Sequence, residues 1–481
     1  MRLFGATAVA AFAGPGVVYA QVAAKPADQA RSQGLSAEDA AQLRAEIAAL
    51  KAQVGKLEAR LDAASPGSAS AAAAPAGSVP TGASSASGAP IQQAAATPAA
   101  QPDFKVTWKG GPEISTASGW SFKPRGRLQF DSGTVSTPTL QGTAQKETGF
   151  ATELRRAYLG AQGTIPGGFG YRVDVDFAPS SQEFTDTYIT WDHKAWNVTV
   201  GQHFPFLSLD QMTSDLDTSM LERAAFNTAF NFERRVGLSA GYAKGDIMIN
   251  GGVFTDNLLD LSSDADNAYS FDGRVVWMPK WGNTQFHLAA SGHWRRQNDQ
   301  GDVAVRYRSR PYTHITDLRF VDTRNLSVDK ELNYGVEAAA ISGPFHFAAE
   351  ANWLRPTLTN GVEPTFFGGY AEVGYFITSG DSRPYKKGAW GAIKPAKAIT
   401  NGGPGAIQVN LRYDRLDLGD AGIQGGSQDS YLASLVWVPV EHIKLMGNYG
   451  HLVFKDSALP ILDTTGDYAA DMFTMRAQVD F

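Results

Sequence analysis

Three arginines alternate with uncharged residues in the segment Arg306-Tyr-Arg-Ser-Arg310. In an extended chain the three guanidinium groups point the same way and lie about 7 Å apart. Like charges on one face repel, so folding alone does not explain the row. Arginine binds phosphate-like oxyanions in bidentate fashion and stays charged at every relevant pH, and conduction needs several sites that release what they bind. The row predicts an anion path; the alternative is an exposed loop that binds lipopolysaccharide phosphates or nothing.

A second candidate site is the long stretch from Gln202 to Glu233, which is followed by Arg234 and Arg235. Its many apolar side chains would not stay in solvent, so we expect it to fold back against protein. Inside a pore this inward loop, about 202–233, would form a constriction. Positive charge would come to that constriction from Arg223, Arg234 and Arg235. Four acids accompany them and either orient the arginines or make the constriction less selective: Asp210, Asp215, Asp217 and Glu222.

No combination of residues in the chain predicts catalysis. The sequence has no nucleophile elbow, HExxH motif or glycine-rich phosphate loop. It also has no cysteine, and its eight histidines are scattered, so we expect no cofactor and no metal. The net charge of −6, without a basic stripe, argues against a nucleic-acid partner. We therefore predict that the protein is not an enzyme.

The elements that would position these residues are β-strands. The last nine residues, Phe473 to Phe481, alternate apolar and polar and stop on an aromatic, as the closing strand of a bacterial transmembrane barrel does. The same alternation predicts about sixteen strands, and no run of about 18 apolar residues indicates a membrane-spanning helix. A soluble β-helix or large sandwich would also alternate, but nearly uncharged exposed faces favour lipid. We predict an all-β, sixteen-stranded antiparallel transmembrane β-barrel over residues 104–481.

Short and long connections alternate along this unit, as in barrels whose short turns face the periplasm. One connection breaks the rhythm, because the long and basic segment 378–406 stands where a short turn is expected. Either this segment folds into the lumen or the strands are miscounted. The short turns are predicted at Pro166–Gly168, Lys244–Asp246, Ser342–Pro344 and Val438–Val440.

Parity along the strands sorts the charged residues by face. With the uncharged face toward lipid, the lumen wall receives acids as well as bases and is mixed in sign. The predicted lumen-facing acids are Asp174, Asp176, Glu337, Glu350 and Glu372. The predicted lumen-facing bases are Arg125, Arg127, Arg156, Arg172, Arg235, Arg274, Arg295, Arg412, Lys444 and Arg476.

Four segments precede the barrel. Residues 1–20 fit a signal peptide cleaved after Ala20, with a disordered alanine-rich start as the alternative, and residues 21–35 form a short lead segment. Residues 36–62 carry a heptad seam that predicts a coiled-coil helix; the alternative is an amphipathic helix packed on another surface. Residues 63–103 predict a disordered linker rich in Ala, Ser, Gly and Pro. Helix and linker would lie in the periplasm, where the coil could contact the cell wall.

Four stretches of the chain form an ordered set of motifs: Phe122-Lys-Pro-Arg-Gly-Arg127, Leu154-Arg-Arg-Ala-Tyr-Leu-Gly160, Phe204-Pro-Phe-Leu-Ser-Leu-Asp210 with Met220-Leu-Glu-Arg223, and Arg306-Tyr-Arg-Ser-Arg-Pro311. This set resembles the outer-membrane phosphate-selective porin O and P family. The resemblance spans essentially residues 104–481 and implies a trimeric sixteen-stranded barrel that takes up anions, with the loop after strand five folded inside.

The resemblance also implies roles for individual residues. Arg155 and Arg156 match the paired constriction arginines, and Arg235 is a further constriction partner by its place after the inward loop. Arg306, Arg308 and Arg310 match part of an anion-guiding ladder. Both Arg155 and Arg156 can face the lumen only at a bulge or a strand end. No lysine of the chain can be assigned to the family's constriction lysine.

Three functions are open on these grounds. The first is a homotrimeric outer-membrane channel for small anions such as phosphate or related oxyanions. The second is a general diffusion porin in which the arginines only set a transverse field. The third is an envelope-tethering protein that the barrel anchors in outer-membrane lipid and that works through its coiled coil.

Overall fold

The computed structural model describes residues 104–108, 110–136, 149–178, 182–261, 267–298, 304–457, 459 and 466–481. The predicted signal peptide (1–20), lead segment (21–35), coiled-coil helix (36–62) and linker (63–103) therefore lie outside the described residues. No helix in the described part is long and apolar enough to cross a membrane.

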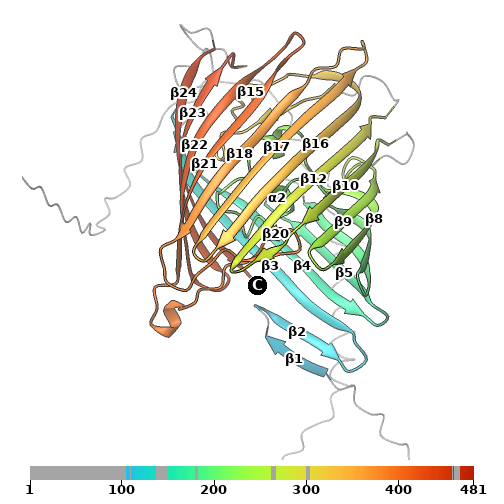
Figure 1. Cartoon of the computed structure of the whole chain (residues 1–481), viewed down its shortest axis with the longest axis vertical. Coiled ribbons are helices and arrows are strands. Elements are labelled where there is room, and N and C mark those ends of the chain that lie inside the picture. The colour runs from blue at the N-terminus through green and yellow to red at the C-terminus, as the bar shows by residue number, and fades with distance from the viewer. Residues whose placement is uncertain are drawn as a thin grey trace, which may run out of the picture. The chain divides into compact units, whose positions relative to one another are not determined.

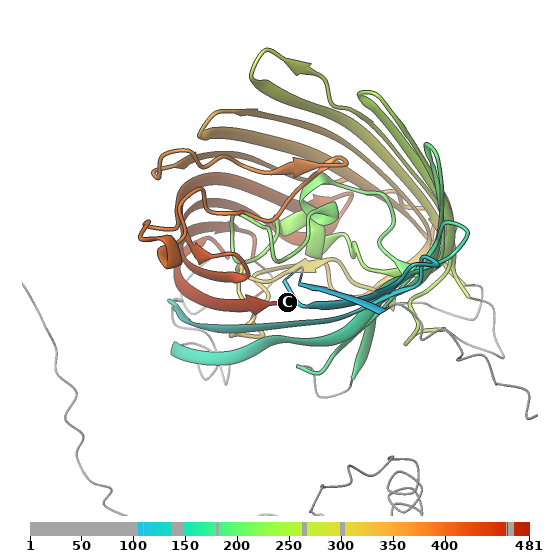
Figure 2. The ribbon, with the colours of Figure 1, turned by 90° about the horizontal axis from the view of Figure 1, so that it is seen from below.

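Sixteen antiparallel strands close into a barrel, as predicted (Figures 1 and 2). Closure is made by the last and first barrel strands, which pair from Met472↔Val135 to Asp480↔Arg127. The barrel strands are β3 (Ser121–Val135), β4 (Gly149–Ile165), β5 (Phe169–Asp176), β6 (Glu183–His193), β7 (Trp196–His203), β8 (Arg235–Lys244), β9 (Ile247–Phe254), β10 (Tyr269–Trp277), β12 (Thr284–Arg296), β16 (Leu326–Ser342), β17 (Phe345–Leu358), β18 (Phe366–Phe376), β21 (Ala406–Asp420), β22 (Ile423–Val440), β23 (Ile443–Lys455) and β24 (Tyr468–Asp480).

The two faces of the wall differ as the alternation predicts. In β24, Thr474 and Arg476 are buried in the interior, whereas Phe473 and Met475 are exposed on the outside. The outward faces of the other strands are likewise rich in exposed aliphatic and aromatic side chains. A closed sheet also pairs every wall strand with two neighbours, which satisfies the backbone where lipid offers no hydrogen bonds.

Short turns gather at one end of the barrel, which we call the turn end, and longer connections gather at the other, the loop end (Figure 1). One predicted turn is wrong. The strand β22 continues through Val440, and the turn follows at Glu441 and His442. A register irregularity between Trp437 and Val440 accommodates Pro439 in the strand, where a proline lacks a ladder hydrogen bond.

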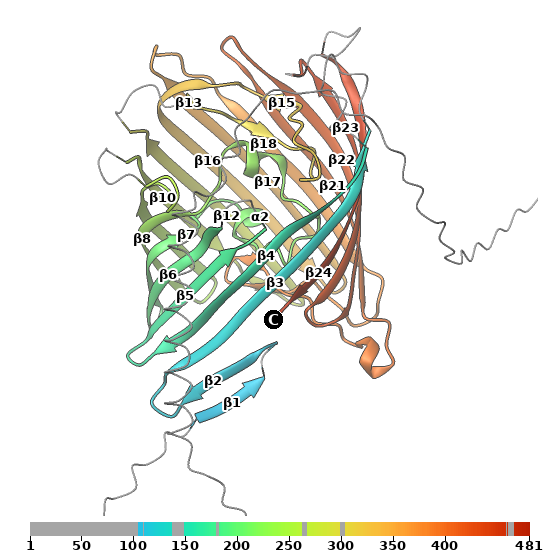
Figure 3. The same ribbon diagram turned by 180° about the vertical axis from the view of Figure 1, so that it is seen from behind.

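Three long connections fold into the lumen and fill much of it (Figures 2 and 3). They meet in one hydrophobic core that also includes wall residues such as Phe366 and Leu416. The inward loop between β7 and β8 contains α2 (Leu209–Met212) and α3 (Ala225–Ala229). The connection from β12 to β16 contains β13 (Ala304–Val305), β14 (Arg308–Ser309) and β15 (Val321–Asp322). The connection from β18 to β21 contains β19 (Tyr385–Lys386), β20 (Ala389–Trp390) and the 3-10 helix η2 (Ile399–Asn401).

The connection from β18 to β21 settles the alternative left open for residues 378–406. Its first half enters the lumen, where Arg383 and Trp390 are buried, and the strand count is unchanged. Its second half, with η2, stays exposed at the turn end. The remaining elements are a hairpin ahead of the barrel, β1 (Phe104–Trp108) and β2 (Pro112–Thr116), and the short β11 (Lys280–Trp281).

Candidate functional site

A bulge in β4 turns two adjacent arginines toward the lumen. Gln129 pairs with Arg156 and Phe130 with Leu154, so Arg155 is the extra residue. An extra residue resets the alternation of faces, which is what two neighbouring inward side chains require. Arg155 Nε lies 2.9 Å from Glu222 Oε1, and Arg156 Nε lies 2.7 Å from Asp215 Oδ2. Both arginines therefore meet the inward loop.

The acids of the inward loop bind arginines of the wall. Asp215 also pairs with Arg127, and Glu222 Oε1 lies 2.8 Å from Arg476 Nη2. Burial alone would raise the pKa of these two acids, but the arginines around them hold both pKa values well below their ordinary range. The loop acids are thus ionised, and they orient wall arginines while cancelling part of their charge.

The wall opposite β4 pairs two buried arginines with acids. Arg412 Nη2 lies 2.7 Å from Glu372 Oε2, and its Nη1 lies 3.2 Å from Asp210 Oδ2 of the inward loop. Arg274 forms a bidentate pair with Glu337, with Nε 2.9 Å from Oε1. These side chains are almost fully buried among the elements that fill the lumen. Their geometry fixes the loop against the wall and leaves no guanidinium face open to a solute.

An open cavity of about 370 Å³ lies between the inward loop and strands β3 to β7. We call it the constriction cavity. Arg234 forms a bidentate pair with Asp186, at 2.9 Å from Nε to Oδ1, and its guanidinium lies 4.2 Å from the ring centre of Phe204. Five cations line the cavity against two carboxylates: Arg127, Arg172, Arg223, Arg234 and Lys387 against Asp186 and Asp215.

Two of the five cavity cations form no ion pair with any described carboxylate. Arg223 donates from Nε and Nη2 only to backbone carbonyls, those of Asp210 at 2.9 Å and Thr213 at 2.7 Å. Lys387 is exposed in the cavity wall and has no hydrogen bond or ion pair within the described part of the chain. These two side chains are the ones whose charge is free for an anion.

Lys387 reaches the cavity at the tip of a hairpin that enters from the turn end. The tip residues Lys387 and Gly388 have φ of 51° and 72°, as the two-residue turn between β19 and β20 requires. The hairpin is held by Gly388 O, which accepts from Arg274 Nη2 at 3.0 Å, and by Trp390 N, which donates to Thr213 Oγ1 at 3.2 Å. The sequence marked this segment as basic but did not single out Lys387.

The predicted ladder lies at the loop end, in the connection that folds into the lumen. The alternation holds, because Tyr307 and Ser309 are buried while the arginines face the more open side. Only Arg308–Ser309 forms a strand, however, and the row is not part of the barrel wall. Arg306 Nε binds Asp322 Oδ1 at 2.7 Å, and Arg310 Nη2 lies 2.8 Å from Asp317 Oδ1.

The side chain of Arg308 forms no hydrogen bond or ion pair with another described residue, and a further arginine joins it. Burial together with the charges of Arg310 and Arg308 lowers the pKa of Arg319 to about 10. Three like charges are therefore gathered at the loop end: we call Arg308, Arg310 and Arg319 the outer cluster. Arg319 was missed because its parity and spacing do not continue the row.

The other predicted lumen bases all carry partners. Arg125 Nη1 donates to Gln162 at 2.7 Å, Arg295 pairs with Asp256, and Lys444 Nζ donates to two carbonyls of the inward loop. Arg235 is buried 3.5 Å from Glu233 and is not among the residues that line the constriction cavity. Within the described ranges, no group of acids and histidines is placed to hold a metal.

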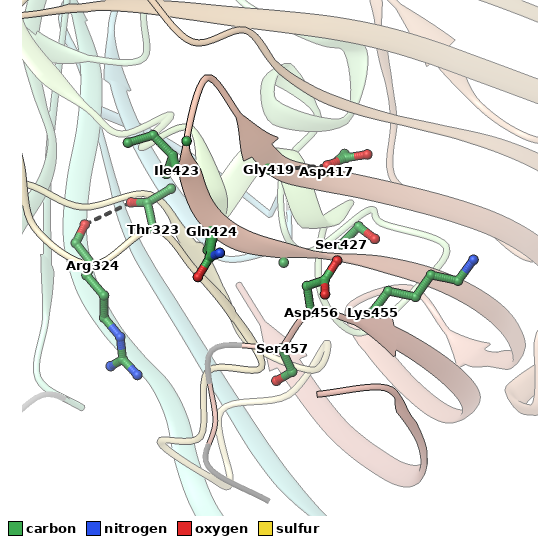
Figure 4. Close-up of a pocket in the computed structure, with 12 residues that line it drawn as sticks. Thr323, Arg324, Asp417, Gly419, Ile423, Gln424, Ser427, Lys455, Asp456 and Ser457 are labelled. Carbon is green, nitrogen blue, oxygen red and sulfur yellow. Dashed lines mark hydrogen bonds between the residues drawn. The ribbon is translucent and has the colours of Figure 1, made fainter. Parts of the chain in front are cut away.

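A larger hollow of about 960 Å³ lies at the loop end, between the β21–β22 hairpin and the segment around Thr323 (Figure 4). Its charged residues are of both signs, with Arg324 and Lys455 at opposite sides in the view and Asp417 and Asp456 between. The dashed bonds in the figure join Thr323 to Arg324 O and Asp417 to Gly419 N. This hollow has no excess of free cations, so the constriction cavity is the better candidate site.

A closed sixteen-stranded barrel with an apolar outer face and a lumen narrowed by folded-in loops defines an outer-membrane porin, a channel rather than an enzyme. The sequence profile of the family described as phosphate-selective porin O and P matches residues 122–481. The chain belongs to this family.

The chain is also similar to a relative in another bacterium and to solved structures. An uncharacterized protein of Caulobacter vibrioides is 43% identical over 456 residues, which covers 93% of this chain and 91% of that protein. The solved anion-selective porin from Comamonas acidovorans has a TM-score of 0.50 at 11% identity and covers 75% of this chain and 100% of its own. OprB of Pseudomonas putida has a TM-score of 0.47 at 10% identity, with 76% and 94% covered. The solved structures show likeness of fold alone.

Proposed function

We propose that this porin conducts small anions, with phosphate or related oxyanions among them, through the constriction cavity. The observation that carries the proposal is the free charge of Arg223 and Lys387 in a cavity lined by five cations and two carboxylates. Membership of the phosphate-selective porin family supports it. So does likeness of fold to a solved porin described as anion-selective.

The paired arginines of the cavity set how tightly an anion is held. Asp215 and Asp186 neutralise part of the charge of Arg127, Arg172 and Arg234. An anion would then compete with fixed carboxylates for the guanidinium groups, which weakens binding, while Arg223 and Lys387 keep the net sign positive. Conduction needs this balance, because a site that binds too firmly does not release.

The outer cluster would act earlier on the same path. Arg310 of the outer cluster pairs with Asp317, so an anion near the cluster would be stabilised mainly by the charges of Arg308 and Arg319. Arg310 Nη1 donates to His314 O at 3.4 Å, and Arg155 Nη2 lies 3.0 Å from His314 Nε2, so Arg310 lies near the bulge arginines. We infer a route from the outer cluster past Arg155 and Arg156 to the constriction cavity.

A general, weakly selective diffusion porin is the second candidate. The observation that favours it is the acid content of the inward loop, since Asp215 and Glu222 cancel charge on four arginines of the wall. In that case the remaining field would sort solutes only weakly by sign.

Single-channel recording in asymmetric KCl separates the two candidates. We expect a reversal potential of the sign that chloride conduction gives. A reversal potential near zero, or one directed by potassium, would contradict the anion proposal. Inorganic phosphate added to chloride solutions tests the oxyanion step, and we expect it to reduce chloride current in the wild-type channel.

We also propose a homotrimer, as the family resemblance implies. Chemical cross-linking of the protein in native outer membranes, followed by denaturing gels, is expected to give dimers and trimers and nothing larger. Cross-linked samples that contain only monomers would contradict the trimer. This outcome is independent of the anion proposal, because conduction is assigned to the lumen of each barrel.

A further inference from the structure

The hairpin β1–β2 ahead of the barrel has one strongly apolar face. Phe104, Val106 and Trp108 are 61%, 66% and 76% exposed and lie on the same side of β1. The opposite side of this strand carries Lys105 and Thr107. Exposed aromatic side chains concentrated on one face of a short sheet mark a contact surface.

Register joins this apolar face to the outside of the barrel. Val106 pairs with Ile114, and Ile114 in turn pairs with Phe122 of β3, so the three side chains share one side of the sheet. Phe122 has the parity of Leu128 and Phe130, which are exposed on the outward face of β3. The hairpin therefore extends the outward apolar face of the barrel past the C-terminal end of β24 (Figures 1 and 3).

A second contact fixes the orientation of the hairpin. Its turn residue Gly110, with φ of 74°, lies against His442 in the turn between β22 and β23. A β-carbon at Gly110 would come to 2.4 Å from the His442 ring, so the approach is possible only for glycine. The ring is held in turn by Asp480, at 2.9 Å from Nδ1 to Oδ2. With both ends docked, the hairpin cannot turn its apolar face inward.

We propose that the apolar face of β1–β2 inserts into the periplasmic leaflet of the outer membrane, at the boundary between headgroups and acyl chains. The face is continuous with the outward apolar surface of β3, it lies at the turn end, and it carries Phe104, Trp108 and Phe122. The indole ring of Trp108 suits the membrane interface, where an apolar body meets a polar edge. The polar side of the hairpin, with Lys105, then faces water, as in other amphipathic surface anchors.

The absence of cysteine from the chain allows a clean test. We would introduce one cysteine at a time, Val106→Cys on the apolar face and Lys105→Cys on the polar face, and attach a nitroxide spin label. Both positions are exposed, so folding should be unaffected, and the heat-dependent shift of the barrel on gels checks this. Leu128→Cys on the outward face of β3 provides the lipid-exposed standard.

The labelled channels are reconstituted in phosphatidylethanolamine and phosphatidylglycerol vesicles, and collisions with oxygen and with a water-soluble nickel chelate are measured. We expect a severalfold higher ratio of oxygen to nickel collisions at position 106 than at position 105, close to the value at position 128. Equal nickel access at positions 105 and 106 would overturn the proposal. So would dipolar broadening at position 106 that disappears on dilution with unlabelled protein, because a second copy would then cover the face.

Discussion

Arginines on the two sides of the lumen differ in their surroundings. On the side of β10 to β21, Arg274 and Arg412 are buried in ion pairs with Glu337, Glu372 and Asp210, and packed loops cover them. On the side of β3 to β7 an open cavity remains, and two of its cations, Arg223 and Lys387, form no ion pair with a described acid. Position on the lumen face therefore does not by itself make an arginine part of the anion path.

The difference follows from where carboxylates are available. A buried guanidinium without a partner is costly, and acids lie beside both Arg274 and Arg412 on the packed side. The cavity side is open, so a solute or water can take the place of a missing carboxylate. We infer a structural role for the first set of arginines and propose a conducting role for the second.

The largest effect is expected for Arg412→Met, which removes the partner of two buried acids. Leaving Glu372 and Asp210 unpaired should lower the free energy of unfolding by about 3–5 kcal/mol. The matched control is Arg415→Met on the same strand, since Arg415 pairs with Asp417 and Asp429 at the surface. An exposed pair of that kind contributes about 0–1 kcal/mol. Urea unfolding in detergent, followed by the gel shift of the barrel, measures both; equal losses would contradict the division.

The second-largest effect is expected on the ion selectivity of the channel. The double variant Arg223→Gln/Lys387→Gln removes both free charges of the constriction cavity. We expect the ratio of chloride to potassium permeability to fall about tenfold, which corresponds to about 1.4 kcal/mol. The loss in free energy of unfolding should be smaller than for Arg412→Met, because Arg223 gives up hydrogen bonds to two backbone carbonyls but no carboxylate is left unpaired.

Lys386→Gln is the matched control for this double variant. Lys386 precedes Lys387 in the same hairpin, is equally exposed, and does not line the constriction cavity. Reversal potentials in asymmetric KCl should therefore match those of the wild type. If Lys386→Gln lowers the permeability ratio as much as the double variant does, the effect is one of total charge and not of the cavity.

The alternation of apolar and polar residues was sufficient to predict the barrel, its sixteen strands and its final strand. The reason is that successive side chains of a strand point to opposite faces of the sheet, here the outside and the lumen. It also predicted that the apolar inward loop would need a protein surface to cover it. Sequence could not identify the partner of each charged residue. Asp215 and Arg156 are far apart in the chain, and only the folded loop brings them to 2.7 Å.

The bulge at Arg155 and the position of Lys387 in the constriction cavity could not be predicted from the pattern of residues. If Arg155 and Arg156 both face the lumen, the alternation must break between them, but the local sequence did not show that the break is a bulge. Lys387 was one of several bases in the long segment 378–406, and its role depends on a hairpin that enters the lumen from the turn end. Pro439 was predicted to lie in a turn, because the sequence does not show that a register irregularity keeps this proline within β22.

A smaller effect is expected at the outer cluster, where the charges are separated from the constriction and partly exposed. Arg308→Ala/Arg319→Ala should weaken phosphate block of chloride current about two- to threefold at low salt. The difference should vanish in 1 M KCl, where the screening length falls to about 3 Å. The control is Arg306→Ala/Asp322→Ala, which removes a whole ion pair and leaves the net charge unchanged. A change in block that persists in 1 M KCl would indicate a direct binding site instead of steering.

The smallest effect is expected from a single acid at the turn end of the lumen. Burial raises the pKa of Asp217 to about 6, although Lys444 and Arg383 act in the opposite direction and Asp480 and Asp215 add to the rise. Asp217 lines a narrow hollow with Lys444 and His442. Below pH 6 the carboxyl is protonated, so this hollow gains one unit of positive charge. The ratio of chloride to potassium permeability should therefore rise modestly as the pH falls from about 7.5 to about 5.

Asp217→Asn should fix the permeability ratio near its low-pH value and remove the dependence in this range. His442→Gln separates the contribution of the histidine in the same hollow, and the pH dependence should survive in that variant. If the dependence persists in Asp217→Asn and disappears in His442→Gln, the titrating group is the histidine. Asp217 would then belong with the paired charges of the packed side, as a residue that fixes the inward loop and takes no part in selecting the ion.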